Sequence, residues 1–193
     1  MNKRAAVPEA KQFWLYPPVP VFLVSTIDSR GRPNVAPHSE LLRPVTNKPL
    51  LVVGINPKHD TYKNILETKE FVVGVASEKL IEAICISGKP FPRGVSEFKL
   101  AGLTPVQAKR VKPPLVGECL ANYECKLQKI FPLQPELHLV VGKVVHASAR
   151  PGLLRKSKES TRESLPALYH VGAGHFRTAR GRPRCSKIDY TQL

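Results

Sequence analysis

The chain has 193 residues, and its 30 Lys and Arg against 15 Asp and Glu give a formal net charge of +15. This length fits one compact domain with an appended tail, and a hydrophobic content of 42% is enough for a packed core. The longest apolar runs, at residues 21–24 and 137–141, are far shorter than the roughly 20 residues that cross a bilayer. Because the N-terminus also has no apolar secretion signal, we expect no membrane association and a cytoplasmic location.

The four cysteines are too few and too scattered to staple a small fold with disulfides. They are Cys85, Cys119, Cys125 and Cys185. No two of them stand two to four positions apart, as the cysteines of a zinc knuckle do, and the histidines are scattered along the chain. The sequence therefore predicts reduced thiols and no metal site.

Short apolar segments separated by turn residues are typical of a mostly β protein. Residues 20–27 and 33–39 predict a hairpin around a turn at 28–31, and residues 50–55 and 71–76 predict two more strands. Later in the chain, two further segments have strand character. Apolar and polar residues alternate over 119–128, which indicates a strand with one exposed face, and 137–146 is apolar enough to be buried on both sides.

Two short helices are expected between these strands. The first begins near residue 60, with Asp60 or Thr61 as its cap, and the second is capped by Ser77. The second helix would bury one apolar stripe, formed by Leu80, Ile81, Ile84 and Cys85. Six or so strands with two short helices predict a single mostly β domain built as a small closed or partly closed barrel, followed by an extended C-terminal segment.

Three segments have residue types that suit a binding site. In 34–39, free backbone N–H groups and the Ser39 hydroxyl can point at a ligand, although an ordinary strand end explains the segment too. In 56–65, a loop runs into a helix N-terminus, where unpaired N–H groups favour an anion such as phosphate. The irregular loop 88–98 carries Phe91, Arg93 and Glu97, and its length suggests a lid or a partner-facing loop.

The anion hypothesis for 56–65 depends on three side chains. Lys58, His59 and the Thr61 hydroxyl would add positive charge and hydrogen-bond donors, whereas the carboxylate of Asp60 would repel an anion. A capped helix with a solvated lysine and histidine is the plain alternative.

Much of the positive charge is concentrated in the last residues. Residues 177–187 carry five positive charges and no negative one, so 177–193 is predicted to be a basic tail that follows a domain at 1–176. Nucleic-acid binding is the alternative reading of this charge. It is disfavoured because no aromatic residues are interleaved to stack on bases.

Taken in order, several motifs resemble the flavin reductase-like family, the flavoredoxin group of FMN-binding split barrels. The resemblance covers roughly residues 15 to 175 and rests on an ordered set of segments rather than on any one of them. These segments are 25–31, 33–39, 59–65, 70–75, 94–103 and 140–145.

The resemblance implies a Greek-key split β-barrel that forms a homodimer and holds FMN at the subunit interface. By this resemblance the isoalloxazine and ribityl chain would be lined by Asn34, Ala36, Pro37, His38 and Ser39. The phosphate would lie at the loop and helix start that contain Asn56, Lys58, His59 and Thr61. Phe91 would approach the ring from its loop, and Tyr169 would close over the flavin.

The function expected on this basis is an FMN-dependent oxidoreductase in which the flavin performs the electron transfer and no side chain is a catalytic residue. NADH, NADPH or a protein would be the electron donor. Two alternatives remain open at this stage. The first is a protein that holds FMN as an electron carrier or sensor without turnover, and the second is a basic β-barrel that binds nucleic acid.

Overall fold

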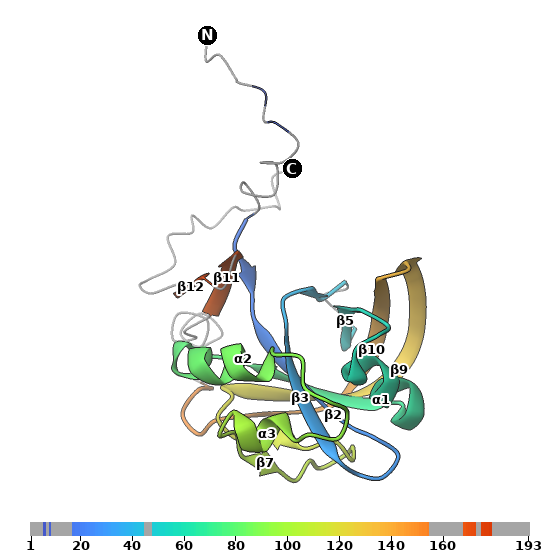
Figure 1. Ribbon diagram of the computed structural model, residues 1–193. Coiled ribbons are helices and arrows are strands. Elements are labelled where there is room, and N and C mark those ends of the chain that lie inside the picture. Colours follow the sequence, from blue (N-terminus) through green and yellow to red (C-terminus); the bar gives the residue numbers. More distant parts are fainter. Residues whose placement is uncertain are drawn as a thin grey trace, which may run out of the picture.

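The computed structural model describes residues 6, 8, 17–44, 48–154, 168–172 and 175–178. Its main feature is a curled antiparallel sheet of seven strands that forms a half-barrel (Figure 1). The strand order across the sheet is β3-β2-β6-β9-β10-β5-β4. The bounds are β2 (Phe22–Ile27), β3 (Pro33–His38), β4 (Leu41–Leu42), β5 (Leu50–Ile55), β6 (Glu70–Val75), β9 (Ala121–Gln134) and β10 (Leu137–Ala149).

Three helices and two small sheets complete the described part of the chain. The helices are α1 (Asp60–Thr68), α2 (Ile81–Ser87), which follows the 3-10 turn η2 (Glu78–Leu80), and α3 (Glu97–Leu100). One small sheet joins β1 (Val19–Pro20), β11 (Leu168–Gly172) and β12 (His175–Thr178), and the other joins β7 (Pro105–Val106) and β8 (Leu115–Val116). None of the helices in the described ranges is long and apolar enough to cross a membrane.

The mostly β split-barrel architecture expected from the sequence is confirmed, and most predicted strands appear close to their expected bounds. The strand expected at 119–128 is longer, because β9 continues to Gln134. Strand β12 continues to Thr178, past the boundary expected at residue 176. Residues 179–193, which hold the rest of the predicted basic tail and Cys185, lie outside the described residues. Cys85, Cys119 and Cys125 are free thiols.

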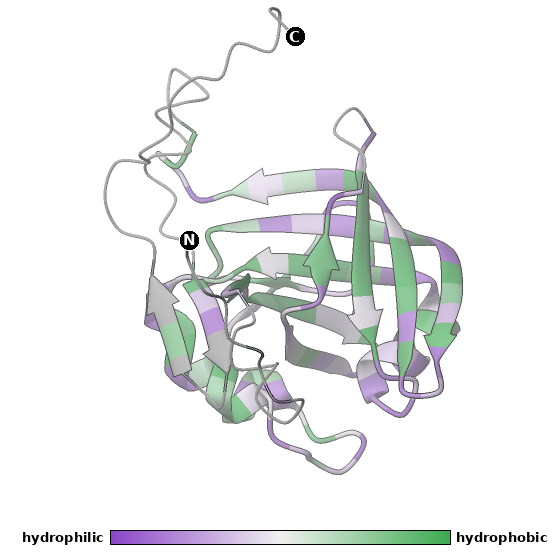
Figure 2. Ribbon diagram, turned by 90° about the horizontal axis from the view of Figure 1, so that it is seen from above, coloured by the Kyte–Doolittle hydropathy of each residue, from purple (hydrophilic) through white to green (hydrophobic). Residues whose placement is uncertain are grey.

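Two hydrophobic clusters lie on opposite faces of β2, because successive side chains of a strand point to opposite sides. Leu23 packs with Ile84 of α2 and Phe98 of α3, whereas Val24 packs with Ile65 of α1. Figure 2 shows the curl of the sheet and the alternation of hydrophobic and hydrophilic residues along several of its strands. Covering both faces of β2 in this way places α1 and the α2–α3 segment on either side of β3.

The predicted cap of α1 and part of the predicted α2 stripe are wrong. His59, not Asp60 or Thr61, occupies the N-cap position, and its side chain makes no capping hydrogen bond. Asp60 instead pairs with Lys63, and the Thr61 hydroxyl accepts a hydrogen bond from Asn34. In the α2 stripe, Leu80 and Ile84 are buried, but Cys85 is exposed to solvent.

The polar face expected for the alternating segment is confirmed at Lys126 and Gln128, which are exposed, but it is wrong at Asn122 and Glu124 of β9, which are buried. The polar atoms of these two buried side chains form hydrogen bonds with the backbone of residues 109–116, which cover this face of the sheet. Asn122 exchanges two hydrogen bonds with the backbone of Val116, and the Glu124 carboxylate accepts the backbone N–H groups of Lys109 and Arg110. Long-range contacts of this kind leave no periodic pattern in the sequence.

Strand β10 is less buried than its apolar sequence predicts. Within 137–146, Val140 and Gly142 are buried, most other residues are half-buried, and Lys143 is exposed. The strand pairs with β9 on one side and β5 on the other, so its backbone is central while its side chains remain partly open in the single chain.

Candidate functional site

A polar cleft of about 690 Å³ lies between β3, the start of α1, the loop after α2 and the start of β10. It brings together nine of the residues expected from the sequence to hold a ligand, although they come from three separate stretches of the chain. These are Asn34, Ala36, Pro37, His38, Asn56, Lys58, His59, Thr61 and Phe91. In Figure 1, β3 runs between α1 on one side and α2 on the other.

Strand β3 contributes one face to the cleft because Asn34, Ala36 and His38 alternate along it and point the same way. Asn34 Nδ2 lies 3.4 Å from the Thr61 hydroxyl, so the strand is joined directly to the first turn of α1. The Thr61 side chain is almost fully buried in this wall. This hydrogen bond holds the polar side chains of β3 next to the N-terminus of α1.

The start of α1 has the properties of an anion site. His59 makes no side-chain cap, and no side chain in the described part of the chain accepts a hydrogen bond from the N–H groups of the first turn. A helix N-terminus of this kind carries partial positive charge. The backbone N–H of Lys58 donates to Asn56 Oδ1 at 2.9 Å, which shapes the loop before the helix. Lys58 forms no ion pair with any described residue, whereas Lys63 pairs with Asp60 at 3.4 Å.

His38 is a neutral imidazole inside the cleft. It is only 7% exposed, and burial lowers its pKa from 6.5 to about 4. Glu40 and a backbone hydrogen bond with Gly54 act in the opposite direction, and the nearby His59 lowers the pKa further. Its Nε2 atom is buried and has no hydrogen-bond partner among the described residues. A ligand in the cleft can supply that partner.

The loop after α2 forms the outer border of the cleft. Lys89, Phe91 and Arg93 of this loop line it, and Phe91 is the aromatic side chain among them. Arg93 Nη2 lies 2.7 Å from Glu67 Oε1 on α1, which ties the loop across the end of the cleft. The structure therefore places basic and aromatic groups of this loop at the border of the cleft.

The sequence comparisons agree with this architecture. A model of the flavin reductase like domain matches residues 16–179. The chain belongs to the flavin reductase-like family. An uncharacterized protein of Aquifex aeolicus is 34% identical over 169 residues, which cover 85% of this chain and 86% of that protein.

Several solved structures have the same fold. Nitrilotriacetate monooxygenase component B from Bacillus cereus is 26% identical with a TM-score of 0.84, covering 94% of this chain and 98% of that chain. The 2-nitrobenzoate 2-nitroreductase of Pseudomonas fluorescens is 25% identical with a TM-score of 0.83, covering 97% and 98%. Flavoredoxin of Desulfovibrio vulgaris has a TM-score of 0.79 at 20% identity, covers 99% and 100%, and supports the fold alone.

Two of the expected site residues lie outside the cleft of this flavin reductase-like chain. Ser39 follows the end of β3, and its backbone N–H donates to Glu40 Oε2 at 3.3 Å. Tyr169 lies on β11, where it pairs with Pro20 of β1 in the small sheet. Neither residue contributes to the cleft within one chain.

The sequence analysis did not single out the other residues of the cleft. Those outside the segments predicted to suit a binding site are Glu40, Gly54, Ser87, Glu136 and Leu137, whereas Lys63, Gly88, Lys89 and Pro90 lie within the predicted segments 56–65 and 88–98. Gly54 has a steric role, because a Cβ atom there would lie 2.8 Å from Glu40 Cβ and 3.1 Å from Leu137 Cδ1. An isolated glycine within an apolar strand was the one available signal for such a close approach.

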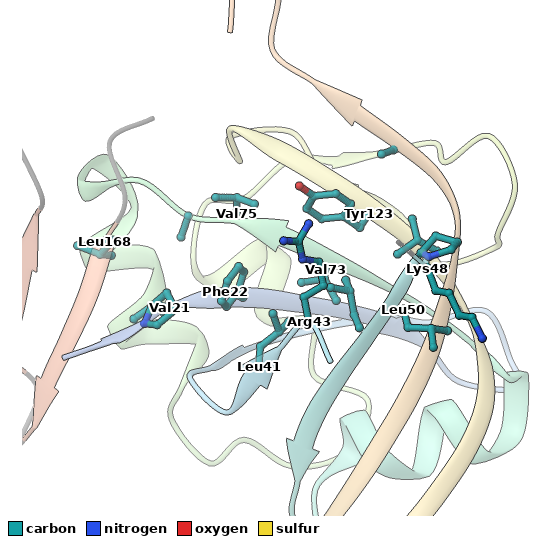
Figure 3. A pocket seen from close by; sticks show the side chains of 16 residues that line it. Val21, Phe22, Leu41, Arg43, Lys48, Leu50, Val73, Val75, Tyr123 and Leu168 are labelled. Atoms are coloured by element: carbon teal, nitrogen blue, oxygen red, sulfur yellow. The ribbon is translucent and has the colours of Figure 1, made fainter. Parts of the chain in front are cut away.

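A second, apolar cavity of about 700 Å³ lies on the concave side of the half-barrel (Figure 3). Phe22, Leu41, Leu50 and Tyr123 are among its lining side chains, and Arg43 and Lys48 stand near them. The described residues contain no group of three or more His, Cys, Asp and Glu side chains that could hold a metal ion.

Proposed function

We propose that this chain is an FMN-binding oxidoreductase that passes electrons through FMN held in the polar cleft. The observation that carries the proposal is the joining of β3 to an uncapped helix N-terminus through Asn34 and Thr61 in a cleft of this size. Membership of the flavin reductase-like family supports it, as do relatives named as a monooxygenase component and a nitroreductase.

The donors at the start of α1 fit the phosphate group of FMN. A phosphate dianion is stabilised by backbone N–H groups at a helix N-terminus, and Lys58 and the Thr61 hydroxyl would add to them. Asp60 also lines the cleft, but its pairing with Lys63 offsets the repulsion between its carboxylate and an anion.

The rest of the cleft fits the remainder of the cofactor. The buried, unpartnered atoms His38 Nε2 and Glu97 Oε2 can form hydrogen bonds with polar atoms of a ring system or a polyol chain. Phe91 offers a flat apolar surface for packing. When bound, FMN supplies the electron transfer. The protein's residues bind the cofactor, orient it and limit the access of water, and no side chain needs to act as a nucleophile.

We propose further that two chains associate through the apolar cavity. Half-buried side chains such as Phe22, Leu41 and Leu50 leave apolar surface on the open side of the half-barrel, and covering it would bury that surface. The half-buried face of β10 is consistent with a partner there. Leu41 and Leu168 line this cavity, so in such a dimer their chain neighbours Ser39 and Tyr169 would lie near the second chain.

The direct test is the visible spectrum of the purified protein. The protein is incubated with FMN and passed through gel filtration. We expect it to retain the flavin absorption band at about 450 nm. A colourless protein after this treatment would contradict the proposal. Anaerobic addition of NADH or NADPH then separates the two remaining hypotheses, since rapid bleaching indicates an oxidoreductase, and a stable band indicates a carrier or sensor that needs another donor.

A further inference from the structure

Glu97 is a buried carboxyl group for which the proposed phosphate contacts give no role. It opens α3, lines the polar cleft and is 9% exposed. Its Oε2 atom is buried and has no hydrogen-bond partner among the described residues. An unpaired carboxylate in such a position would be costly, because burial away from water penalises the charged form.

The surroundings of Glu97 favour its neutral form. Burial raises the pKa of the carboxyl group, and repulsion by the Asp60 carboxylate on α1 raises it further. Backbone hydrogen bonds from Glu97 itself and from Val35 on β3 lower the pKa, but they do not reverse the net upward direction.

The other charged groups of the cleft do not pair with Glu97. Arg93, on the loop, pairs with Glu67, and Lys63, on α1, pairs with Asp60. His38, on β3, is held in its neutral form. Lys58 and Lys89 line the same cleft, but neither forms an ion pair with Glu97.

We propose that Glu97 faces the cleft as a neutral carboxylic acid and donates a hydrogen bond from its carboxyl group to an acceptor atom of the bound flavin, such as a carbonyl oxygen or a ring nitrogen. This inference rests on the proposed function. A neutral acid meets two needs at once: it adds no further negative charge to those of the phosphate and Asp60, and it satisfies the orphaned oxygen through its proton.

The pH dependence of FMN binding depends on which protonation state of Glu97 binds the flavin. If binding requires the protonated carboxyl group, FMN affinity falls as the pH rises through the pKa of Glu97, by up to about tenfold for each pH unit. If Glu97 were instead a carboxylate that accepts hydrogen bonds from the ligand, affinity would rise over the same range. Glutamine resembles the neutral acid in shape and can donate from its amide, so Glu97→Gln should bind FMN without this pH dependence.

The experiment measures FMN dissociation constants by fluorescence quenching from pH 5 to 9 for the wild type, Glu97→Gln and a control, Glu82→Gln. Glu82 is an exposed residue of α2 that does not line the cleft. Titration of the FMN phosphate changes the affinity of all three proteins alike, so its effect cancels in the ratio of wild-type to Glu97→Gln affinity. We expect this ratio to fall with increasing pH and the Glu82→Gln profile to follow the wild type.

The outcomes separate this inference from the proposed function. A constant or rising ratio, with tight binding by all three proteins, overturns the role of Glu97 and leaves FMN binding intact. Absence of binding by all three proteins overturns the proposed function and the inference with it. A second readout without ligand is the infrared band of a protonated carboxyl group at pH 5, the acidic end of the titration, which should be stronger in the wild type than in Glu97→Gln. Equal bands in the two proteins contradict the neutral acid.

Discussion

Arg93 Nη2 lies 2.7 Å from Glu67 Oε1, and this ion pair joins the loop that borders the polar cleft to helix α1. Glu67 also accepts the backbone N–H of Ser29 at 2.9 Å, so one exposed carboxylate connects three segments of the chain. The Ser29 hydrogen bond and then the Arg93 hydrogen bond lower the pKa of Glu67 and keep it ionised. The border of the cleft is therefore positioned by a residue outside it.

We expect Glu67→Ala to weaken FMN binding although Glu67 does not line the cleft. An exposed ion pair contributes at most about 1 kcal/mol, so the loss should be up to about fivefold, with little change in thermal stability. Fluorescence titration of Glu67→Ala, Arg93→Ala and the double variant measures the coupling. If Arg93→Ala weakens binding while Glu67→Ala has no effect, Arg93 acts without the help of Glu67.

Lys58→Ala should weaken the binding of FMN more than that of riboflavin, which has no phosphate. The loss of one charge near a phosphate dianion is expected to cost about 1 kcal/mol, or about fivefold in affinity, and to reduce the salt dependence of binding. The control is Lys129→Ala, because Lys129 lies over the Phe131 ring on β9, away from the cleft. Equal losses for FMN and riboflavin would place the phosphate elsewhere.

His38 should make the protein less stable at acidic pH. Its pKa is lowered from 6.5 to about 4, so between these values the unfolded chain binds a proton that the folded protein does not. Stability therefore falls as the pH drops through this window, by about 3 kcal/mol in total as an upper limit. Urea unfolding of the flavin-free protein at pH 7, 5.5 and 4.5 measures this loss.

His38→Gln supplies the control for that pH dependence, since glutamine does not titrate. The variant should lose less stability than the wild type between pH 7 and 4.5, while carboxylates with lowered pKa values, such as Asp28, affect both proteins alike. Parallel stability profiles for the two proteins would show that His38 is protonated without cost in the folded state.

Association through the apolar cavity is tested by two neighbouring leucines of β4. Leu41 lines the cavity, whereas Leu42 is 53% exposed and does not line it. Leu41→Lys should shift the protein from dimer to monomer in sedimentation experiments, and Leu42→Lys should not, because only the first places a charge within the proposed interface. Circular dichroism confirms that both variants are folded. A wild type that sediments as a monomer contradicts the dimer itself.

Strand positions and turns were readable from local patterns, since β-branched runs, alternation and turn residues act over a few positions. Residues 50–55 were expected as a strand and form β5, and the turn at 28–31 contains Gly31 with a φ of 79°. The two motifs that contribute most to the cleft, on β3 and at the start of α1, were recognisable because their residue types suit ligand contacts. The side chain at the helix cap was not, since cap choice depends on competing partners such as Asn34 for Thr61 and Lys63 for Asp60.

The burial of Glu124 and the joining of Glu67 to Arg93 could not be read in this way. Both involve residues more than ten positions apart, brought together when the sheet curls and the intervening chain crosses it. The same holds for Glu97, whose carboxyl group has no unusual neighbour in sequence and becomes buried when α3 packs against β3. Periodicity reports which face of an element is apolar, but the free energy of a buried polar group depends on partners that packing alone supplies.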